Sequence, residues 1–219
     1  MRILLSSVIA IFLIFAPSTY AQGDTPTIYR CHENSGKKIA LTFDDGPHPH
    51  LTVKILNILE KYNVKATFFV VGENAENYSP VLRQILACGH EIGNHTYSHD
   101  KIDIGELEKC ENTVYEHLEY KTKLFRPPEG HINENVKSVA QKMGYDIILW
   151  DVDTRDWDHT PPEKILNIIN KQVRSGSIIL MHDYIGHNSP TLMALEMILP
   201  KLINDGYQFV TVSELISSI

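Results

Sequence analysis

Two histidines and two aspartates have the residue types and the spacing of a metal-assisted hydrolytic site. His95 and His99 lie four residues apart, so on one turn of helix their imidazoles would point the same way and could hold one ion. Asp45 adds a carboxylate, and two neutral imidazoles with one carboxylate and an open position form a common catalytic zinc arrangement. We therefore predict that Asp45, His95 and His99 bind a divalent metal, Zn²⁺ or another such as Co²⁺.

A turn signal follows the two adjacent carboxylates. Gly46 and Pro47 come directly after Asp44 and Asp45, so the strand must stop there and both carboxylates can face the same opening. One carboxylate can then bind metal while the other handles protons. A simpler interpretation is that this segment only forms a turn and caps the next helix. That interpretation does not explain why the pair and both histidines belong to the same expected rim.

Three further residues could supply an acid and orienting groups. His182 ends an apolar segment, where its imidazole is available as a general acid, and Asp156 could hold that ring in the protonated form. Arg126 could fix the carboxylate of Asp44 and keep it ionised. Each of the three alone is more often a salt-bridge or surface residue. Together with the metal ligands, they meet the requirements for metal-assisted hydrolysis.

An alternation of short β-branched or aromatic runs with segments of helical period must position these residues. The expected strands are 39–43, 67–71, 90–93, 124–126, 146–150, 177–181 and 208–210. The expected helical segments are 51–62, 81–86, 107–118, 136–143 and 165–173. The pattern predicts an α/β fold, either a small incomplete barrel or an open doubly wound sheet. In both folds chemistry occurs at the carboxyl ends of the strands, which is where the candidate residues lie.

The first 21 residues differ in kind from the rest of the chain. Arg2 precedes an uncharged apolar run over 3–16 and a small-residue exit at Ala21, which is typical of a cleaved signal peptide. The run is shorter than the roughly 20 residues of a membrane span, so we expect no stable span after cleavage, an uncleaved anchor being the alternative. The predicted organisation is a signal peptide at 1–21, a polar lead-in at 22–37 and one domain at 38–219. The mature protein is expected to be secreted or cell-wall associated.

Charge and cysteine content narrow the possible partners. The 219 residues include 20 Lys and Arg against 27 Asp and Glu, a net charge of −7, and the longest basic run is Lys37-Lys38. This composition argues against a nucleic-acid partner. Cys31, Cys88 and Cys110 lie in no CxxC motif, so we predict no metal or redox role for them and at most one internal disulfide. We expect a monomer.

Five segments, in this order, resemble the motifs of the polysaccharide deacetylases, the NodB-homology carbohydrate esterases. They are TFDDGP at 42–47, HTYSH at 95–99, FRPPEG at 125–130, DTRDW at 153–157 and LMH at 180–182. The resemblance spans nearly the whole chain from Lys38. It implies a distorted (β/α) barrel of about seven parallel strands. It also implies removal of N-acetyl groups from polysaccharides that contain N-acetylglucosamine, such as peptidoglycan or chitin-like oligomers.

The resemblance also implies a role for each matching residue. The implied ligands of the divalent metal, usually zinc, are Asp45, His95 and His99. The implied catalytic residues are Asp44 as base, His182 as acid, Arg126 orienting Asp44, and Asp156 tuning His182. The implied substrate-binding residues are Trp157 and Leu180, which would receive the acetyl methyl group, together with Pro127 and Glu129 of the Arg-Pro-Pro segment.

Glu129 departs from the family pattern. Members commonly have an aromatic residue after Arg-Pro-Pro, and its backbone N–H helps to form the oxyanion hole. The backbone donor remains at Glu129, whereas stacking of an aromatic ring on a sugar is lost. The added negative charge is expected to disfavour anionic substrates.

Several alternatives remain open at this point. The substrate could be peptidoglycan, a chitin-like oligomer, another N-acetylated exopolysaccharide, or an O-acetylated polymer such as xylan. A non-haem iron oxygenase also uses two histidines and one carboxylate, but its usual β-rich scaffold does not fit the alternating pattern. A sugar-binding pseudoenzyme would keep the fold without turnover. It is disfavoured because all the proton-handling positions are filled.

Overall fold

The computed structural model describes residues 25–33, 35–184, 186 and 189–217, so the predicted signal peptide lies outside the described residues. In this part of the chain nine strands form one sheet, and all the ladders between them are parallel. The order is β1-β6-β5-β4-β3-β2-β8-β7, with β9 also paired to β2. The strands are β1 Ile28–Tyr29, β2 Lys38–Asp44, β3 Thr67–Val70, β4 Glu91–Asn94, β5 Leu124–Phe125, β6 Asp146–Ile148, β7 Val152–Asp153, β8 Ile178–His182 and β9 Gln208–Val210.

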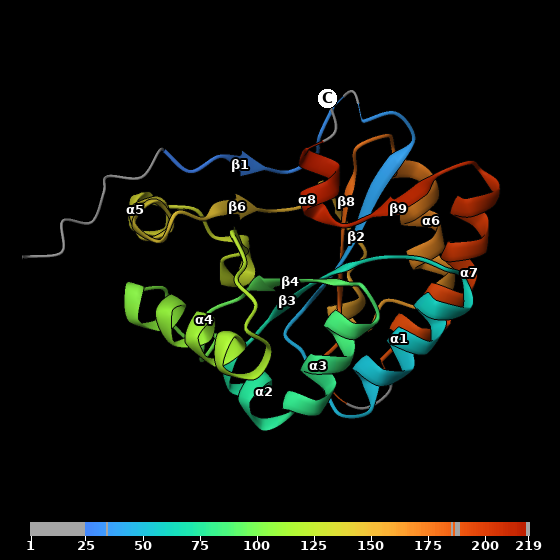
Figure 1. The fold of residues 1–219 in the computed structure, drawn as a ribbon. Helices are drawn as coiled ribbons and strands as arrows, with labels where there is room; N and C mark the ends of the chain where they lie inside the picture. The colour runs from blue at the N-terminus through green and yellow to red at the C-terminus, as the bar shows by residue number, and fades with distance from the viewer. Residues whose placement is uncertain (1–24, 34, 185, 187–188, 218–219) are drawn as a thin grey trace, which may run out of the picture.

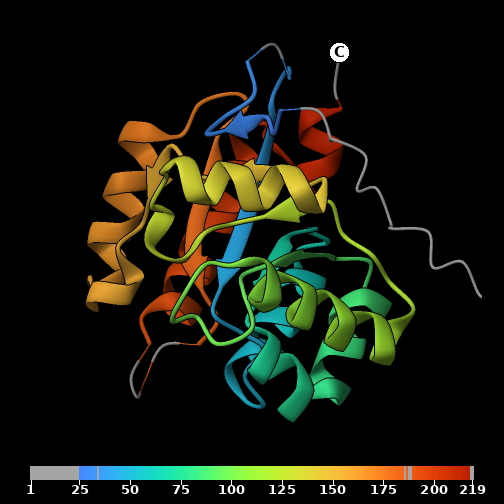
Figure 2. The same ribbon diagram turned by 90° about the vertical axis from the view of Figure 1, so that its left-hand side faces the viewer.

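Helices surround the curved sheet, with α8 near the start of β2 (Figures 1 and 2). The helices are α1 Leu51–Lys61, α2 Gly72–Asn77, α3 Ser79–Ala87, α4 Ile104–Leu118, α5 Glu134–Met143, α6 Pro162–Gln172, α7 Thr191–Asn204 and α8 Val212–Ile216. Two single turns of 3-10 helix occupy Pro128–Gly130 and Asp156–Asp158. The expected α/β fold and distorted (β/α) barrel are confirmed. Because no ladder among the described residues joins β1 to β7, the barrel is incomplete.

All seven expected strands are present, with ends shifted by at most two residues. The structure adds β1 and β7, which have two residues each and are too short to show a periodic pattern. The β1 strand pairs with β6, so part of the polar lead-in belongs to the sheet. Helices α2, α7 and α8 have no counterpart among the expected helical segments. Of these, α2 and α8 are short, and α7 contains Pro200, which weakens its helical signature.

The side chains of β2 alternate between two packing layers. Ile39, Leu41 and Phe43 are fully buried in the main core with side chains of α1, α3 and α7. Ala40 packs in a second cluster that includes Val212 of α8. A slip of one residue would exchange these layers, and each large apolar side chain that lost its burial would cost about 1.5–3 kcal/mol.

This alternation directs the polar residues of β2 and β8 into the barrel. Successive side chains of a strand point to opposite faces, so Asp44 shares the inner face with Ala40. Ile178 of β8 packs in the same inner cluster, which places Leu180 and His182 on the inner face as well. The register of the two strands pairs Asp44 directly with His182. The two residues predicted to handle protons are therefore neighbours at one end of the sheet.

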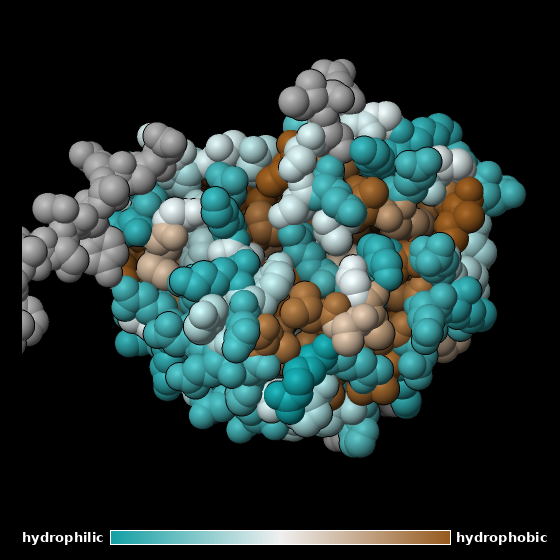
Figure 3. Space-filling view, viewed as in Figure 1, coloured by the Kyte–Doolittle hydropathy of each residue, from teal (hydrophilic) through white to brown (hydrophobic). Residues whose placement is uncertain are grey.

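The helices, the surface and the cysteines bear on the predicted location and chemistry of the chain. No helix in the described part of the chain is long and apolar enough to cross a membrane. The face seen in Figure 1 is mainly hydrophilic, with smaller hydrophobic areas near its centre and right edge (Figure 3). Cys31, Cys88 and Cys110 are all free, and burial raises the pKa of the Cys110 thiol to about 12.

Candidate active site

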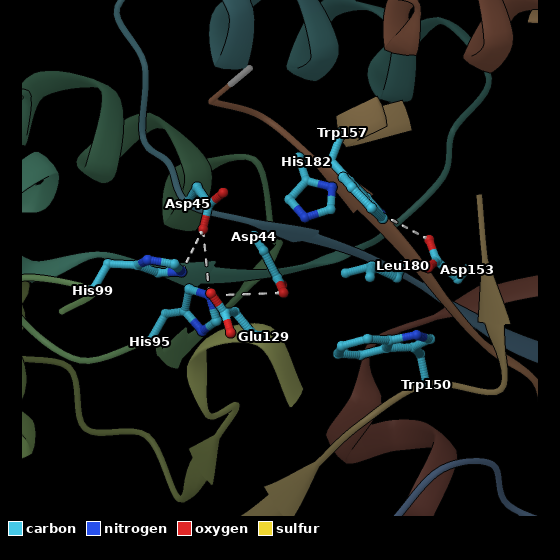
Figure 4. Close-up of a pocket in the computed structure, with 10 residues that line it drawn as sticks. All are labelled: Asp44, Asp45, His95, His99, Glu129, Trp150, Asp153, Trp157, Leu180 and His182. Carbon is cyan, nitrogen blue, oxygen red and sulfur yellow. Dashed lines mark hydrogen bonds and ion pairs between the residues drawn. The ribbon is translucent and has the colours of Figure 1, made fainter. Parts of the chain in front are cut away.

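A cavity of about 510 Å³ lies at the carboxyl ends of the strands (Figure 4). Its lining residues are Asp44, Asp45, His95, His99, Glu129, Trp150, Asp153, Trp157, Leu180 and His182. In Figure 4 the cluster of Asp45, His95 and His99 lies on one side of the cavity. Trp150, Trp157, Leu180 and His182 lie on the other side, with Asp44 between the two groups.

Asp45, His95 and His99 converge on one point. Asp45 Oδ1 lies 3.4 Å from Nε2 of His95 and 3.3 Å from Nε2 of His99. One potential ligand atom from each residue lies within 4.8 Å of the other two. Asp45 Oδ1 is buried, and no group among the described residues donates a hydrogen bond to it. A buried, unpartnered carboxylate oxygen between two imidazole nitrogens fits the requirements of a divalent cation such as Zn²⁺ or Co²⁺.

The electrostatics of Asp45 agree with this geometry. Burial alone would raise the pKa of Asp45, but its interactions with the nearby imidazoles, chiefly that of His95, outweigh burial and hold the pKa below its usual value. The carboxylate is therefore ionised, as metal binding requires.

A backbone carbonyl orients the His95 ring. Nδ1 of His95 lies 2.7 Å from the carbonyl oxygen of Arg126, so the Nδ1–H donates to that oxygen. In the neutral ring this hydrogen bond places the proton on Nδ1 and leaves Nε2, which faces Asp45, free to bind a metal, the arrangement found in histidines that bind metal. His95 is only 2% exposed, which fixes the ring in place.

The expected helical turn at residues 95–99 is wrong. This segment is irregular, and Thr96 and His99 have positive φ angles of 68° and 63°. Side chains stabilise the turn: Thr96 N–H donates to Asn94 Oδ1 at 2.9 Å, and His99 N–H donates to Thr96 Oγ1 at 3.1 Å. These left-handed residues, instead of helical periodicity, bring the two imidazoles together.

Asp44 forms a buried ion pair with Arg126, which is 0% exposed. Nη1 of Arg126 donates to Asp44 Oδ1 at 2.7 Å and to Thr42 Oγ1 at 2.8 Å. Nε and Nη2 donate to the carbonyl oxygens of Ile148 and Leu149, both at 3.1 Å. Because its donors are directed at fixed acceptors, Arg126 holds the Asp44 carboxylate in one orientation.

A glycine makes room for the ring that supports Arg126. A Cβ on Gly93 would lie 2.4 Å from Cδ1 of Phe69, so only glycine lets the Phe69 ring occupy this position. The Arg126 guanidinium lies 4.1 Å from the centre of that ring. The cation–π contact fixes the guanidinium from the side of the sheet.

His182 and Asp156 form a second buried pair. Nδ1 of His182 lies 2.8 Å from Asp156 Oδ1, and Asp156 Oδ2 accepts from His182 N–H at 2.9 Å and from Thr191 Oγ1 at 2.7 Å. Burial alone would lower the pKa of His182, but the hydrogen bond and charge of Asp156 outweigh burial and raise it to about 9. The imidazole can therefore carry a proton at neutral pH.

Trp157 and Leu180 line the apolar side of the cavity. Trp157 is 49% exposed, whereas Leu180 is 3% exposed. Trp157 Nε1 donates to Asp153 Oδ1 at 3.3 Å. Trp150 faces the same space and lies at the end of the expected strand 146–150. Asp153 belongs to the DTRDW segment but had no predicted role, and Trp150 was missed, although an aromatic residue at the carboxyl end of a strand is a usable signal.

In the Arg-Pro-Pro-Glu segment, Glu129 lines the cavity and Pro127 does not. Glu129 lines the cavity with a positive φ of 57°, and its exposed carboxylate lies 3.1 Å from Nδ1 of His131. Pro127 is buried and does not line the cavity, so its substrate-binding role stays a prediction. Thr42 and Thr191, which contact Arg126 and Asp156, have no sequence signal that distinguishes them from other buried threonines.

Comparisons with known proteins agree with the geometry. The polysaccharide deacetylase family model matches residues 32–148. The chain is 40% identical over 208 residues to a peptidoglycan-N-acetylglucosamine deacetylase of Bacillus cereus, covering 91% of this chain and 94% of that protein. It is 40% identical to the peptidoglycan-N-acetylmuramic acid deacetylase PdaC of Bacillus subtilis, covering 82% of this chain and 38% of PdaC. It is 34% identical to a chitooligosaccharide deacetylase of Azorhizobium caulinodans, covering 77% and 90% of the two chains.

Solved structures give the same grouping. A peptidoglycan N-acetylglucosamine deacetylase in complex with 4-naphthalen-1-yl-N-oxidanyl-benzamide superposes with a TM-score of 0.83 and 36% identity, covering 88% and 94% of the chains. An acetyl xylan esterase from Clostridium thermocellum in complex with a cobalt ion superposes with a TM-score of 0.75 and 34% identity, covering 82% of this chain and 90% of the esterase. A CE4 family pseudoenzyme from Bacillus anthracis superposes with a TM-score of 0.80 and 28% identity, covering 88% of this chain and 70% of the pseudoenzyme. The chain thus belongs to the polysaccharide deacetylase family.

Proposed function

We propose that this chain is a metal-dependent hydrolase that removes N-acetyl groups from polysaccharides containing N-acetylglucosamine and releases acetate. Peptidoglycan and chitin-like oligomers are the proposed substrates, because the named deacetylase relatives act on these two classes. The observation that carries the proposal is the position of Asp44 and His182. They are paired across β2 and β8, next to the Asp45, His95 and His99 cluster.

The proposed chemistry begins with the metal and the base. Asp45, His95 and His99 would hold a divalent ion, which would supply Lewis acidity toward the acetamide carbonyl and the attacking water. Asp44 then accepts a proton from the attacking water. Its ion pair with Arg126 keeps the carboxylate oriented for this transfer.

The leaving group requires an acid. His182 donates its Nε2 proton to the departing sugar nitrogen, which gives a free amine and acetate. Asp156 accepts the hydrogen bond from Nδ1, so it holds the ring in the protonated form and directs Nε2 into the cavity. The backbone N–H of Glu129 is proposed to stabilise the oxyanion that develops during attack.

Substrate contacts are proposed on the apolar side of the cavity. Leu180 and Trp157 would receive the acetyl methyl group, because they present apolar surface next to the proposed catalytic pair. Pro127 of the Arg-Pro-Pro segment is a further proposed substrate-binding residue.

The remaining expectations belong to the same proposal. They are zinc as the bound metal, a cleaved signal peptide at 1–21, a single catalytic domain at 38–219, a monomeric state, and a secreted or cell-wall location. The acidic net charge of the chain argues against a nucleic-acid partner.

The decisive experiment is an acetate-release assay with purified protein reconstituted with Zn²⁺ or Co²⁺. The panel contains chitooligosaccharides, peptidoglycan and acetylated xylan. We expect acetate from the amide substrates. Acetate from xylan alone would favour O-acetyl esterase activity, the chemistry named for one structural relative. Sugar binding without acetate release from any polymer would favour a pseudoenzyme, the description of another structural relative.

A further inference from the structure

Asp45 has a backbone conformation that is uncommon for a residue with a Cβ. Its φ angle is 77°, in the left-handed region that L residues with a Cβ rarely adopt. Such a conformation persists only where surrounding contacts enforce it. The structure must therefore contain groups that hold the chain at Asp45.

Three neighbouring elements hold the carbonyl groups of this turn. The Asp44 carbonyl accepts from the N–H of Asp183 at 3.1 Å, and the Gly46 carbonyl accepts from the N–H of Val71 at 2.9 Å. The Asp45 carbonyl accepts from Nδ2 of Asn74, in α2, at 2.7 Å. Two of these donors belong to the backbone, so Asn74 is the side chain on which the orientation of the Asp45 peptide depends.

The Asp183 carboxylate packs against Gly46 of the same turn. Asp183 is 1% exposed, and a Cβ on Gly46 would lie 2.1 Å from its Oδ2. Oδ2 accepts from Thr52 Oγ1 at 2.6 Å, and Thr52 Oγ1 in turn accepts from the N–H of His48 at 2.7 Å. These contacts connect the chain before and after Asp45 to helix α1, so the turn cannot relax without disturbing a buried carboxylate.

We propose that Asn74 and Asp183 are positioning residues that hold the turn at Asp44, Asp45 and Gly46 in the shape required for Asp45 to bind a divalent metal. The inference rests on the metal site of the proposed function. Without the two side chains, Asp45 is free to return to a negative φ angle. Its Oδ1 then leaves the point where it lies 3.4 Å and 3.3 Å from the imidazole nitrogens of His95 and His99.

The test measures metal affinity directly in the full mature chain. Metal-free wild type, Asn74→Ala and Asp183→Asn are titrated with Zn²⁺ and with Co²⁺ by calorimetry or chelator competition. Removal of a group that orients a metal ligand typically weakens metal binding about 10–100-fold, and this is the expected loss for both variants. The visible absorption spectrum of bound Co²⁺ should change as well, because the carboxylate ligand is displaced.

The control is Asn77→Ala, which removes an exposed asparagine at the end of the same helix α2. We expect this control to bind metal as the wild type does. The metal-free Asn74→Ala protein should melt within about 2–4 °C of the wild type, since Asn74 is only half-buried and loses one hydrogen bond.

Wild-type metal affinity in Asn74→Ala would overturn the proposal for Asn74, and wild-type affinity in Asp183→Asn would overturn it for Asp183. If Asp183→Asn fails to fold, Asn74→Ala decides the proposal alone. The outcome is separable from the proposed function. Weakened metal binding in these variants, combined with no acetate release by the wild type, would support the positioning role and contradict the deacetylase assignment.

Discussion

The cavity has a buried wall and an exposed rim, and the two are built differently. Asp44 and His182 form part of the wall, and they are held from behind by Arg126 and Asp156. Arg126 and Asp156 are 0% exposed, and each makes at least three polar contacts. On the rim, Trp157 is 49% exposed and the Glu129 side chain is 71% exposed. Buried charges with fixed partners have one geometry, whereas exposed groups adapt and are screened by solvent. The wall should therefore determine whether the reaction occurs, and the rim which polymer is preferred.

The largest effect should follow from loss of the proposed acid. His182→Ala removes the group that protonates the leaving nitrogen, and general acid catalysis contributes about 10²–10⁴-fold. We expect kcat for acetate release to fall by this factor, with a smaller change in KM. Circular dichroism of the variant provides the control for folding. A kcat within threefold of the wild type would show that the proton comes from another group.

The next effect concerns stability. Arg126→Met leaves the carboxylate of Asp44 buried without a partner, and breaking a buried pair in this way costs about 3–5 kcal/mol. Denaturant unfolding should report this loss in the free energy of unfolding. The double variant Arg126→Met with Asp44→Asn should lose less than the sum of the single variants, because neither charge is then left unpaired. Strictly additive losses would contradict a coupled pair.

A third prediction concerns the titration of His182. Asp156→Asn removes the charge that raises the pKa of His182, and the burial that lowers it remains. The pKa of His182 in the metal-free variant should therefore fall from about 9 toward or below 6.5, measured from imidazole NMR resonances.

The raised pKa of His182 also predicts how the stability of the fold depends on pH. Because the folded-state pKa of His182 is raised above the unfolded value of 6.5, the wild type gains stability below pH 6.5 and loses it as pH rises through about 9. The Asp156→Asn variant should lack this decline over that pH range. An unchanged pKa in the variant would mean that groups other than Asp156 set the charge of the ring.

The sequence predicts the residues that line the buried wall better than the residues that hold them in place. The short apolar and β-branched runs of β2 and β8 predict buried strands, and the residues at their ends, Asp44 and His182, lie together as expected. Thr42 and Thr191 contact Arg126 and Asp156 from distant parts of the chain. No local pattern distinguishes such contacts, because they depend on how the strands pack.

The sequence also did not predict the backbone conformation between the two histidines of the proposed metal cluster. Spacing alone predicts a helical turn for His95 and His99, yet Thr96 and His99 are left-handed. A positive φ at a residue with a Cβ is unfavourable locally. It is stabilised here in part by contacts from a distant segment, since the N–H groups of Gly72 and Glu73 donate to the carbonyl oxygens of Thr96 and Tyr97, and a single sequence does not display such contacts. The ligand types could therefore be predicted, whereas the path of the chain between them could not.

The smallest effect should come from the rim and should depend on salt. Glu129 presents an exposed carboxylate beside the cavity, and a free amine on a neighbouring sugar of a partly deacetylated oligomer would be attracted to it. Exposed ion pairs contribute about 0.2–1 kcal/mol. Glu129→Gln should thus lower kcat/KM for partly deacetylated chitooligosaccharides by at most about fivefold at low salt, and the difference should vanish near 1 M salt.

The control for this prediction is charge-matched. Glu163→Gln removes an exposed carboxylate from α6, away from the cavity lining, and should leave kcat/KM unchanged. The fully acetylated oligomer carries no amine, so Glu129→Gln should hardly alter its turnover. If Glu129→Gln instead reduced turnover of both oligomers equally and independently of salt, the carboxylate would act through the position of its own backbone N–H. The rim would then belong with the wall, because it would affect catalysis itself and not the choice of polymer.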